Sequence, residues 1–185
     1  MNTQVEDLTP KARRTRSTLL AAARTELGHR GIAGANVMAV CERAGVGRTS
    51  FYNYFEDADA LVSVVARETM LELKERFDHL HQDLPRGRGR LKACLRMILD
   101  LAVEDPETIL LLESLSASVP EIIELLEAEI AEELSAFTNS REEDLTVLGQ
   151  FLALTILAVA RQLAKCRLPK HDIDQHVEFM MRVCS

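Results

Sequence analysis

Helix-breaking residues are scarce in this sequence, which has 8 glycines and 5 prolines among 185 residues. Glycine and proline destabilise the interior of a helix more than any other residues, so the stretches between them favour long helices. Apolar side chains recur in these stretches at the spacing of one helical face. The sequence therefore predicts an all-α protein without a β-sheet, long enough for one or two domains.

Capping residues set the predicted helix boundaries. Thr9 followed by Pro10 is typical of a helix start, because threonine caps free N–H groups and proline suits the first helical position. Further predicted caps are Asn36, Asp57, Asp105 and Ser140, the last with Glu143 at the spacing of a capping box. The predicted helices span about residues 10–30, 37–43, 48–54, 58–84, 91–103, 106–116, 120–137, 141–167 and 173–183.

The formal charge is unevenly distributed along the chain. Its net value is −7, yet residues 1–55 carry 8 basic and 4 acidic side chains, whereas the remainder carries 14 basic and 25 acidic ones. A basic head attracts a polyanion such as DNA and an acidic body repels it, which would fix the orientation of approach. A basic cluster can also simply solvate a helical face, and charge alone does not decide between the two interpretations.

Residues 37–55 meet the requirements of a helix-turn-helix motif. Cys41 supplies the small residue at the close crossing of the two helices, and Gly45 supplies the sharp turn. The shared core would consist of Val37, Val40, Val46 and Phe51. In such motifs the second helix enters the major groove of DNA. The polar and aromatic residues near its outward side are Arg48, Thr49, Ser50, Tyr52, Asn53 and Tyr54.

Residues from about Thr15 to Leu61 resemble the DNA-binding domain of the TetR family of transcription regulators. The resemblance rests on Ala22-Ala23, Arg30-Gly31, Ala44-Gly45-Val46, Phe51-Tyr52-Asn53-Tyr54-Phe55 and Ala60-Leu61. It implies a three-helix DNA-binding domain at residues 1–56, followed by an effector-binding and dimerisation domain of five to six helices at residues 57–185. It further implies a cytoplasmic repressor that binds a palindromic operator as a homodimer and is released by a small apolar or amphipathic effector.

The resemblance also assigns roles to single residues. Base edges would be contacted by Arg48, Thr49, Ser50 and Asn53, and phosphates or sugars by Tyr52 and Tyr54, while Phe55 would lie in the core. The guanidinium of Arg48 suits either a guanine edge or a phosphate, and both interpretations stay open.

Four positions depart from the family pattern. Cys41, Leu27, Gly47 and Ala58 stand where alanine, phenylalanine, serine and lysine are usual. Loss of the lysine would remove a phosphate contact, and the acidic neighbours Glu56, Asp57 and Asp59 would oppose DNA if they faced it. The basic residues expected to compensate are Arg13, Arg14 and Arg16.

The segment 141–167 is apolar around most of its circumference and must be covered on more than one side. A second copy of the chain is the expected cover, with the final helix completing an intersubunit four-helix bundle, as the resemblance implies. The alternative is burial of both helices within one chain. The expected interface residues are Leu148, Leu152, Val159, Phe179 and Met180.

An apolar effector cavity is expected between the head and the dimer helices. Its predicted lining, in which methionine adapts its shape and threonine offers a hydroxyl, is Met97, Ile98, Leu101, Leu112, Phe151 and Thr155. Ordinary core packing explains the same residues. Glu113, which lies between leucines, is expected on an exposed helical face.

Several classes of protein lack support in the sequence. Cys41, Cys94, Cys166 and Cys184 form no CxxC pair and no histidines are spaced i, i+4, so neither a metal site, a cofactor nor a disulfide scaffold is predicted. Buried thiols are expected, with a redox-sensing thiol as the alternative. An enzyme is not predicted, because there is no glycine-rich phosphate loop and no nucleophile–base pair.

Two further expectations concern partners. The longest apolar stretch, residues 145–160, is shorter than the ~20 residues a bilayer requires, and no signal peptide is recognised, so no membrane contact is predicted. The rival to a DNA-binding regulator is a ligand-independent or partner-controlled helical interaction protein with a weakly DNA-binding head, whose acidic segment 121–133 docks a basic partner. The six glutamates of that segment are more simply interpreted as a solvated face.

Overall fold

The computed structural model describes residues 9–166 and 171–184. Over these residues the chain forms helices and no strand, which confirms the predicted all-α class. The helices are α1 Pro10–Arg30, the short 3-10 helix η2 Ile32–Ala35, α2 Val37–Ala44, α3 Arg48–Phe51, α4 Ala58–Asp83, α5 Arg88–Glu104, α6 Pro106–Ser116, α7 Glu121–Ser135, α8 Glu142–Cys166 and α9 His171–Val183.

Side-chain caps begin four of these helices where the sequence predicted. Each cap accepts a hydrogen bond from a backbone N–H three residues later, which satisfies one of the free donors of the first turn. The donor–cap pairs are Ala12 N to Thr9 Oγ1 at 3.3 Å, Ala39 N to Asn36 Oδ1 at 2.9 Å, Ala60 N to Asp57 Oδ1 at 2.7 Å and Thr108 N to Asp105 Oδ1 at 3.2 Å.

Other boundaries differ from the prediction. The third helix ends at Phe51 instead of Tyr54, because the chain turns there and the N–H of Tyr54 bonds to the carbonyl of Phe51 at 2.9 Å. The fifth helix begins three residues earlier than predicted, directly after Gly87, whose φ of 126° suits glycine. The eighth begins at Glu142, so Ser140 does not directly precede it, and residue 167 lies outside the described residues.

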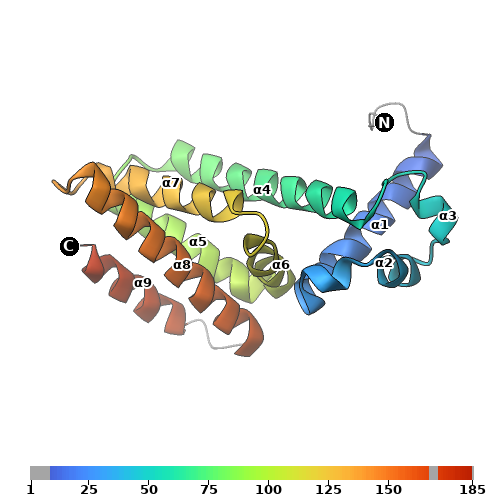
Figure 1. Cartoon of the computed structure of the whole chain (residues 1–185). Coiled ribbons are helices and arrows are strands. Elements are labelled where there is room, and N and C mark those ends of the chain that lie inside the picture. The colour runs from blue at the N-terminus through green and yellow to red at the C-terminus, as the bar shows by residue number, and fades with distance from the viewer. Residues whose placement is uncertain (1–8, 167–170, 185) are drawn as a thin grey trace.

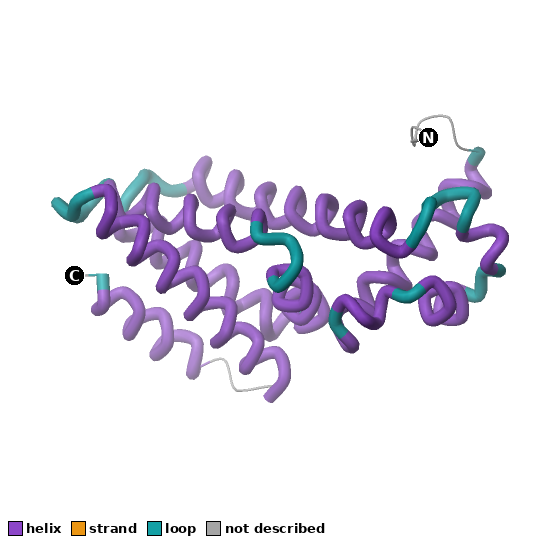
Figure 2. Tube along the Cα trace, in the orientation of Figure 1, coloured by secondary structure: helices purple, strands orange, loops and turns teal. Residues whose placement is uncertain are grey.

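The helices form a small head and a longer body. Figure 1 shows α1, α2 and α3 at one end, and α4 runs from them along the body formed with α5 to α9. Short loops join most of the helices, as Figure 2 shows. The end of α1 lies against α6, where Ser114 Oγ donates to the Leu27 carbonyl at 2.8 Å. A Cβ added at Gly28 would lie 3.4 Å from the Glu107 carbonyl, so the two helices are closely packed.

The helix α8 lies against α5, α6 and α7. It approaches α7 closely at Gly149, where an added Cβ would lie 3.2 Å from the Glu127 carbonyl. With 25 residues, α8 is long and apolar enough to cross a membrane by length and composition alone. This corrects the expectation that the chain has no apolar stretch of sufficient length. One side of it, including Leu152, Ile156 and Leu163, is buried inside the chain, and this packing accounts for its apolar composition on that side.

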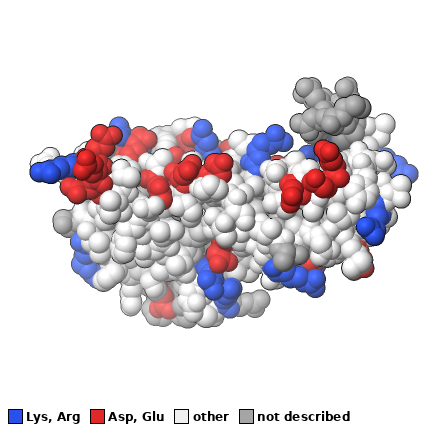
Figure 3. All heavy atoms as spheres, in the orientation of Figure 1, with Lys and Arg blue, Asp and Glu red and all other residues white. Residues whose placement is uncertain are grey.

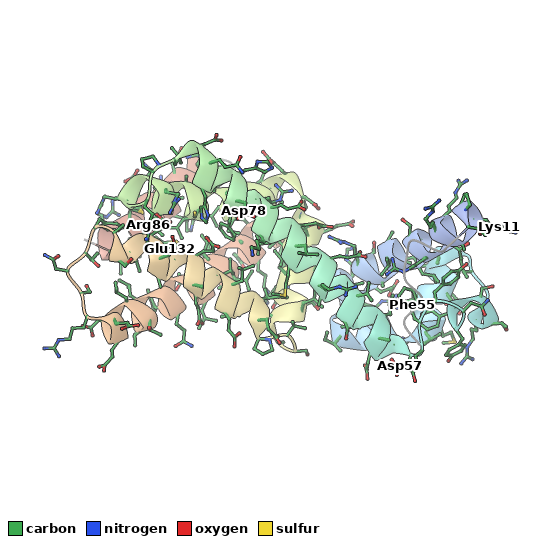
Figure 4. All side chains as sticks on the ribbon, turned by 90° about the horizontal axis from the view of Figure 1, so that it is seen from above. Lys11, Phe55, Asp57, Asp78, Arg86 and Glu132 are labelled. Carbon is green, nitrogen blue, oxygen red and sulfur yellow. The ribbon has the colours of Figure 1, made fainter. Side chains whose placement is uncertain are left out.

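The acidic helix α7 is not simply a solvated face. Glu133 is fully buried, accepts from the N–H of Gly87 at 2.8 Å and pairs with Arg90 at 2.6 Å. The hydrogen bond with Glu133 raises the pKa of the Arg90 guanidinium above its ordinary value. At the surface, Arg86 and Glu132 lie together (Figure 4), with Nε 3.3 Å from Oε1. These contacts hold the connection between α4 and α5 against α7.

The cysteines differ in accessibility. Cys41, Cys94 and Cys184 are buried, as expected, whereas Cys166 is exposed. Burial raises the pKa of the Cys94 thiol to about 12 and also raises the pKa of Cys41 and of Cys184. Because the thiolate is the reactive form, iodoacetamide at neutral pH should label Cys166 alone in the native protein and all four cysteines in denaturant. Peptide mass spectrometry measures this pattern, and labelling of Cys94 as fast as Cys166 would contradict the packing of α5.

Candidate nucleic-acid interface

The helix-turn-helix geometry follows from the turn after α2. Gly45 has φ 63° and ψ 30°, the left-handed conformation that glycine adopts readily. The N–H of Val46 then reaches back to the Cys41 carbonyl at 3.0 Å and closes the end of α2. Cys41 is buried, as expected for the small residue between crossing helices. The chain is thereby redirected into α3.

Aromatic packing fixes α3 in the head. Phe51 and Phe55 are buried with ring centroids 5.6 Å apart, and the Tyr52 ring meets Phe51 edge-on at 5.4 Å. Phe55 thus lies in the core, as the resemblance implied (Figure 4). Since Phe51 faces inward, its helical neighbours are left to face solvent.

The outward side of this segment carries most of the predicted DNA contacts. Arg48, Thr49 and Asn53 are exposed, and Tyr52 is 52% exposed. Ser50 and Tyr54 are half-buried, and Tyr54 packs against the core. Gly47 precedes α3 without a side-chain cap, so the departure from serine leaves this short helix with one hydrogen bond fewer than a capping hydroxyl could supply.

Basic residues of α1 fall into two groups. Arg13 and Arg14 are exposed, and neither forms an ion pair with the described part of the chain. Arg16 instead lies over the Phe55 ring at 5.6 Å, with Nη1 3.8 Å from Glu68 Oε1. These contacts make Arg16 a link between α1 and α4, which reduces its availability for a phosphate.

The molecule carries its charge asymmetrically. Figure 1 places α3 at the end of the molecule away from α9, and Lys11 near the start of α1 lies at that end in Figure 4. On the face drawn in Figure 3, acidic side chains gather over α7 and the start of α8, and a smaller acidic group lies beside the head. The carboxylate of Asp57 caps α4. The sequence analysis expected this residue to oppose DNA only if it faced the DNA. A polyanion is therefore favoured at the head end of the molecule.

A buried carboxylate that the sequence analysis missed supports the motif. Glu26 of α1 is buried and pairs with Arg43 of α2, whose Nε lies 2.5 Å from Oε1, and with Arg30 at 3.3 Å. This contact fixes α2, and through the turn α3, on the long first helix. The signal was present in the sequence, since Glu26 lies at helical spacing from the apolar residues Ala22 and Ala23.

The six predicted pocket residues do not line one cavity. Leu101 and Leu112 line a cavity of about 330 Å³ between α1, α4, α5 and α6. Phe151 and Thr155 line a separate apolar groove on the outer side of α8 and α9. Ile98 is buried in the core and Met97 packs against the core. These two residues agree with the alternative interpretation, which was ordinary core packing. Glu113 is half-buried and lies 3.4 Å from Arg161.

The predicted interface residues lie on different sides of α8 and α9. Leu152 and Met180 are buried within the chain, which corrects their assignment, and Leu148 and Val159 are half-buried. Phe179 is 61% exposed. Other large apolar side chains of α8 and α9 that are exposed are Val147, Phe151, Leu154 and Val183.

Comparison with known proteins agrees with this geometry. Residues 19–65, a quarter of the chain, match the model of the bacterial regulatory proteins of the tetR family. A TetR-like transcriptional regulator from Rhodococcus sp. RHA1 is 18% identical, with a TM-score of 0.76 and 96% of each chain covered. The fatty acid degradation regulator FadR from Bacillus halodurans is 16% identical, with a TM-score of 0.70 and 96% of each chain covered. A TetR-family transcriptional regulator from Pectobacterium atrosepticum is 18% identical, with a TM-score of 0.60 over 95% of this chain and 93% of that one.

These identities are low, so the solved structures show a shared fold, and the match in residues 19–65 ties the head to a named family. The head therefore matches the model of the tetR family over residues 19–65, and the chain as a whole shares the fold of solved TetR-like regulators.

Proposed function

We propose that the protein is a cytoplasmic repressor that binds a palindromic operator as a homodimer and leaves it when a small amphipathic molecule binds the body. The coarser part of this proposal, a DNA-binding transcription regulator with a ligand-binding domain, is supported by the family match in residues 19–65 and by the shared fold. The proposed division places residues 1–56 in the DNA-binding domain and residues 57–185 in the effector-binding and dimerisation domain.

The observation that carries the proposal is the outward face of α3. Arg48, Thr49 and Asn53 offer exposed donors beside a buried Phe51 that anchors the helix. A guanidinium and an amide are side chains that pair bidentately with guanine and adenine edges in the major groove. Tyr52 and the exposed Arg13 and Arg14 suit phosphate contacts, which fix the position of the protein without selecting sequence.

Support for a dimer comes from the outer side of α8 and α9. Phe151 and Leu154 of α8 and Phe179 of α9 are large apolar side chains more than half exposed in the single chain. Together with Val147 and Val183 they form what we call the α8–α9 face. Exposed apolar side chains gathered on neighbouring helices favour an interaction site, and in the proposed dimer a second copy covers them by two-fold symmetry. Two heads related by that axis require a palindromic operator.

Selection from a pool of random double-stranded DNA tests the proposal. The wild-type protein should recover a palindrome with half-sites about one helical turn, or a multiple of it, apart. If the guanidinium reads a base, Arg48→Ala should lose the base preference at one position of each half-site. If the guanidinium contacts phosphate, the variant should bind all sequences more weakly by the same factor. Lys74→Ala, an exposed change on the body, should leave the selected sequence unaltered. Recovery of no common sequence by the wild-type protein would contradict the proposal.

A further inference from the structure

We propose that the cavity at the junction of head and body binds a small zwitterion, of the size and chemistry of a free amino acid with an aliphatic side chain, and that this ligand is the effector. The inference rests on the proposed function for its regulatory part. It places the effector site between α1 of the head and α4, α5 and α6 of the body, where the predicted lining of Met97, Ile98, Phe151 and Thr155 does not reach.

The cavity has a floor of leucines and one threonine and a charged rim. Its volume is about 330 Å³, near the lower end of the range for small-molecule sites. The lining residues Thr69, Leu73, Leu101 and Leu112 are almost completely buried and form the floor. The charged lining residues are more exposed and form the rim. A ligand that fits is therefore small, with a short apolar part and charged groups near its open end.

The charges of the rim define the complementary ligand. Arg24 of α1 donates to both oxygens of Glu72 of α4, with Nη1 2.9 Å from Oε1, so these two charges neutralise each other. Asp105 accepts from the backbone N–H and the hydroxyl of Thr108. Arg76 and Glu107 also line the cavity, and neither has an ion-pair partner among residues 9–166 and 171–184. Among the described residues of the rim, Arg76 is a cation and Glu107 and Asp105 are anions without an ion pair, so the rim can receive the carboxylate and the ammonium group of a zwitterion.

Occupation of this cavity acts directly on the head. Arg24 and Ala21 belong to α1, which also contains the start of the DNA-binding domain, whereas Glu107 belongs to the first turn of α6. The end of α1 is held on α6 by the hydrogen bond of Ser114 and by the close approach at Gly28. In Figure 1, α6 lies at the end of the body that faces the head. A ligand that touches both sides of this junction stabilises one position of the head over others, and this shifts operator affinity.

Thermal unfolding in the presence of each of the twenty standard L-amino acids, followed by calorimetric titration of those that stabilise, tests the proposal. At least one amino acid should raise the melting temperature, because a ligand that binds only the folded state stabilises it. Arg76→Gln and Glu107→Gln should each lower the affinity for that amino acid about tenfold or more, because each loses a charge-assisted hydrogen bond. Lys74→Gln on α4 and Glu104→Gln at the end of α5 are matched controls outside the cavity and should leave its affinity unchanged.

Two further arms complete the experiment. The deaminated acid and the decarboxylated amine of the stabilising amino acid should each bind about tenfold more weakly or worse, since each lacks one charge. Ala21→Phe, which fills the cavity from an exposed position of α1, should abolish the response while Arg76 and Glu107 remain. Stabilisation by none of the amino acids, or equal binding by the wild type and both charge variants, would overturn the proposed site.

The regulatory claim is tested apart from binding. The stabilising amino acid should change the affinity of the wild-type protein for its selected operator. At the same amino-acid concentration, the operator affinity of the Arg76→Gln variant should stay unchanged. Binding without any change in operator affinity would overturn the effector role while the site stands. Failure of the wild type to select any DNA would overturn the proposed function, and the melting experiment would still decide whether the cavity binds a zwitterion.

Discussion

Glu133→Ala is expected to lower the free energy of unfolding by about 3 to 5 kcal/mol, because it leaves the guanidinium of Arg90 buried without its main partner. Glu133 is fully buried, lies 2.6 Å from Arg90 and also accepts from the N–H of Gly87. The substitution therefore removes a charge pair and a backbone hydrogen bond at the connection between α4 and α5. Urea denaturation followed by circular dichroism measures the loss.

Glu132→Ala is the matched control for this prediction. Glu132 is adjacent in α7 and contacts Arg86 at 3.3 Å, but the pair is half exposed to water, so its loss should cost less than about 1 kcal/mol. Replacing both buried partners, Arg90→Leu with Glu133→Leu, should recover much of the stability because no charge is left unpaired. Equal effects of the two alanine substitutions would show that Glu133 is not paired in the folded core.

Phe151→Asp combined with Leu154→Asp is expected to convert the proposed dimer into a monomer and to weaken operator binding about 100-fold or more. Both side chains are more than half exposed in the single chain and lie in the α8–α9 face. Burial of a carboxylate in an apolar interface is costly, so the variant should not associate. Separated heads lose the effective concentration that two linked half-site contacts provide.

Sedimentation equilibrium and operator titration measure the two effects of this variant. Because the positions are exposed in one chain, its helical circular dichroism spectrum should be preserved. Thr146→Asp, an exposed polar position of the same helix, should remain dimeric with unchanged operator affinity. A double aspartate variant that stays dimeric would exclude the α8–α9 face as the interface between subunits.

Most helix boundaries could be predicted because they depend on residues close together in the sequence. Thr9, Asn36, Asp57 and Asp105 are caps that act on backbone groups three residues away, so their role can be read from neighbouring letters. Gly45 is similar, because a sharp turn requires its conformation. The end of α3 was mispredicted, since Tyr52 and Asn53 suit a helix and a turn alike, and the packing of Phe51 and Phe55 decides between them.

Distant pairings could not be predicted. Arg90 and Glu133 are 43 positions apart, and nothing near either residue indicates the other. The faces of α8 were equally hidden, because a helix that is apolar on nearly every side gives no hint that Leu152 turns inward and Phe151 outward. The cavity at the junction required the placement of α1 beside α6, which depends on tertiary packing between separate helices.

Equilibrium binding of the selected palindrome and of a scrambled duplex of equal length and composition, at two salt concentrations, tests the central claim of sequence-specific recognition most directly. We predict that two chains bind each palindrome about 1,000-fold or more tightly than the scrambled duplex, and that both affinities fall as salt rises because phosphate contacts release counterions. Equal affinity for the two duplexes at both salt concentrations would contradict the assignment of α3 as a recognition helix.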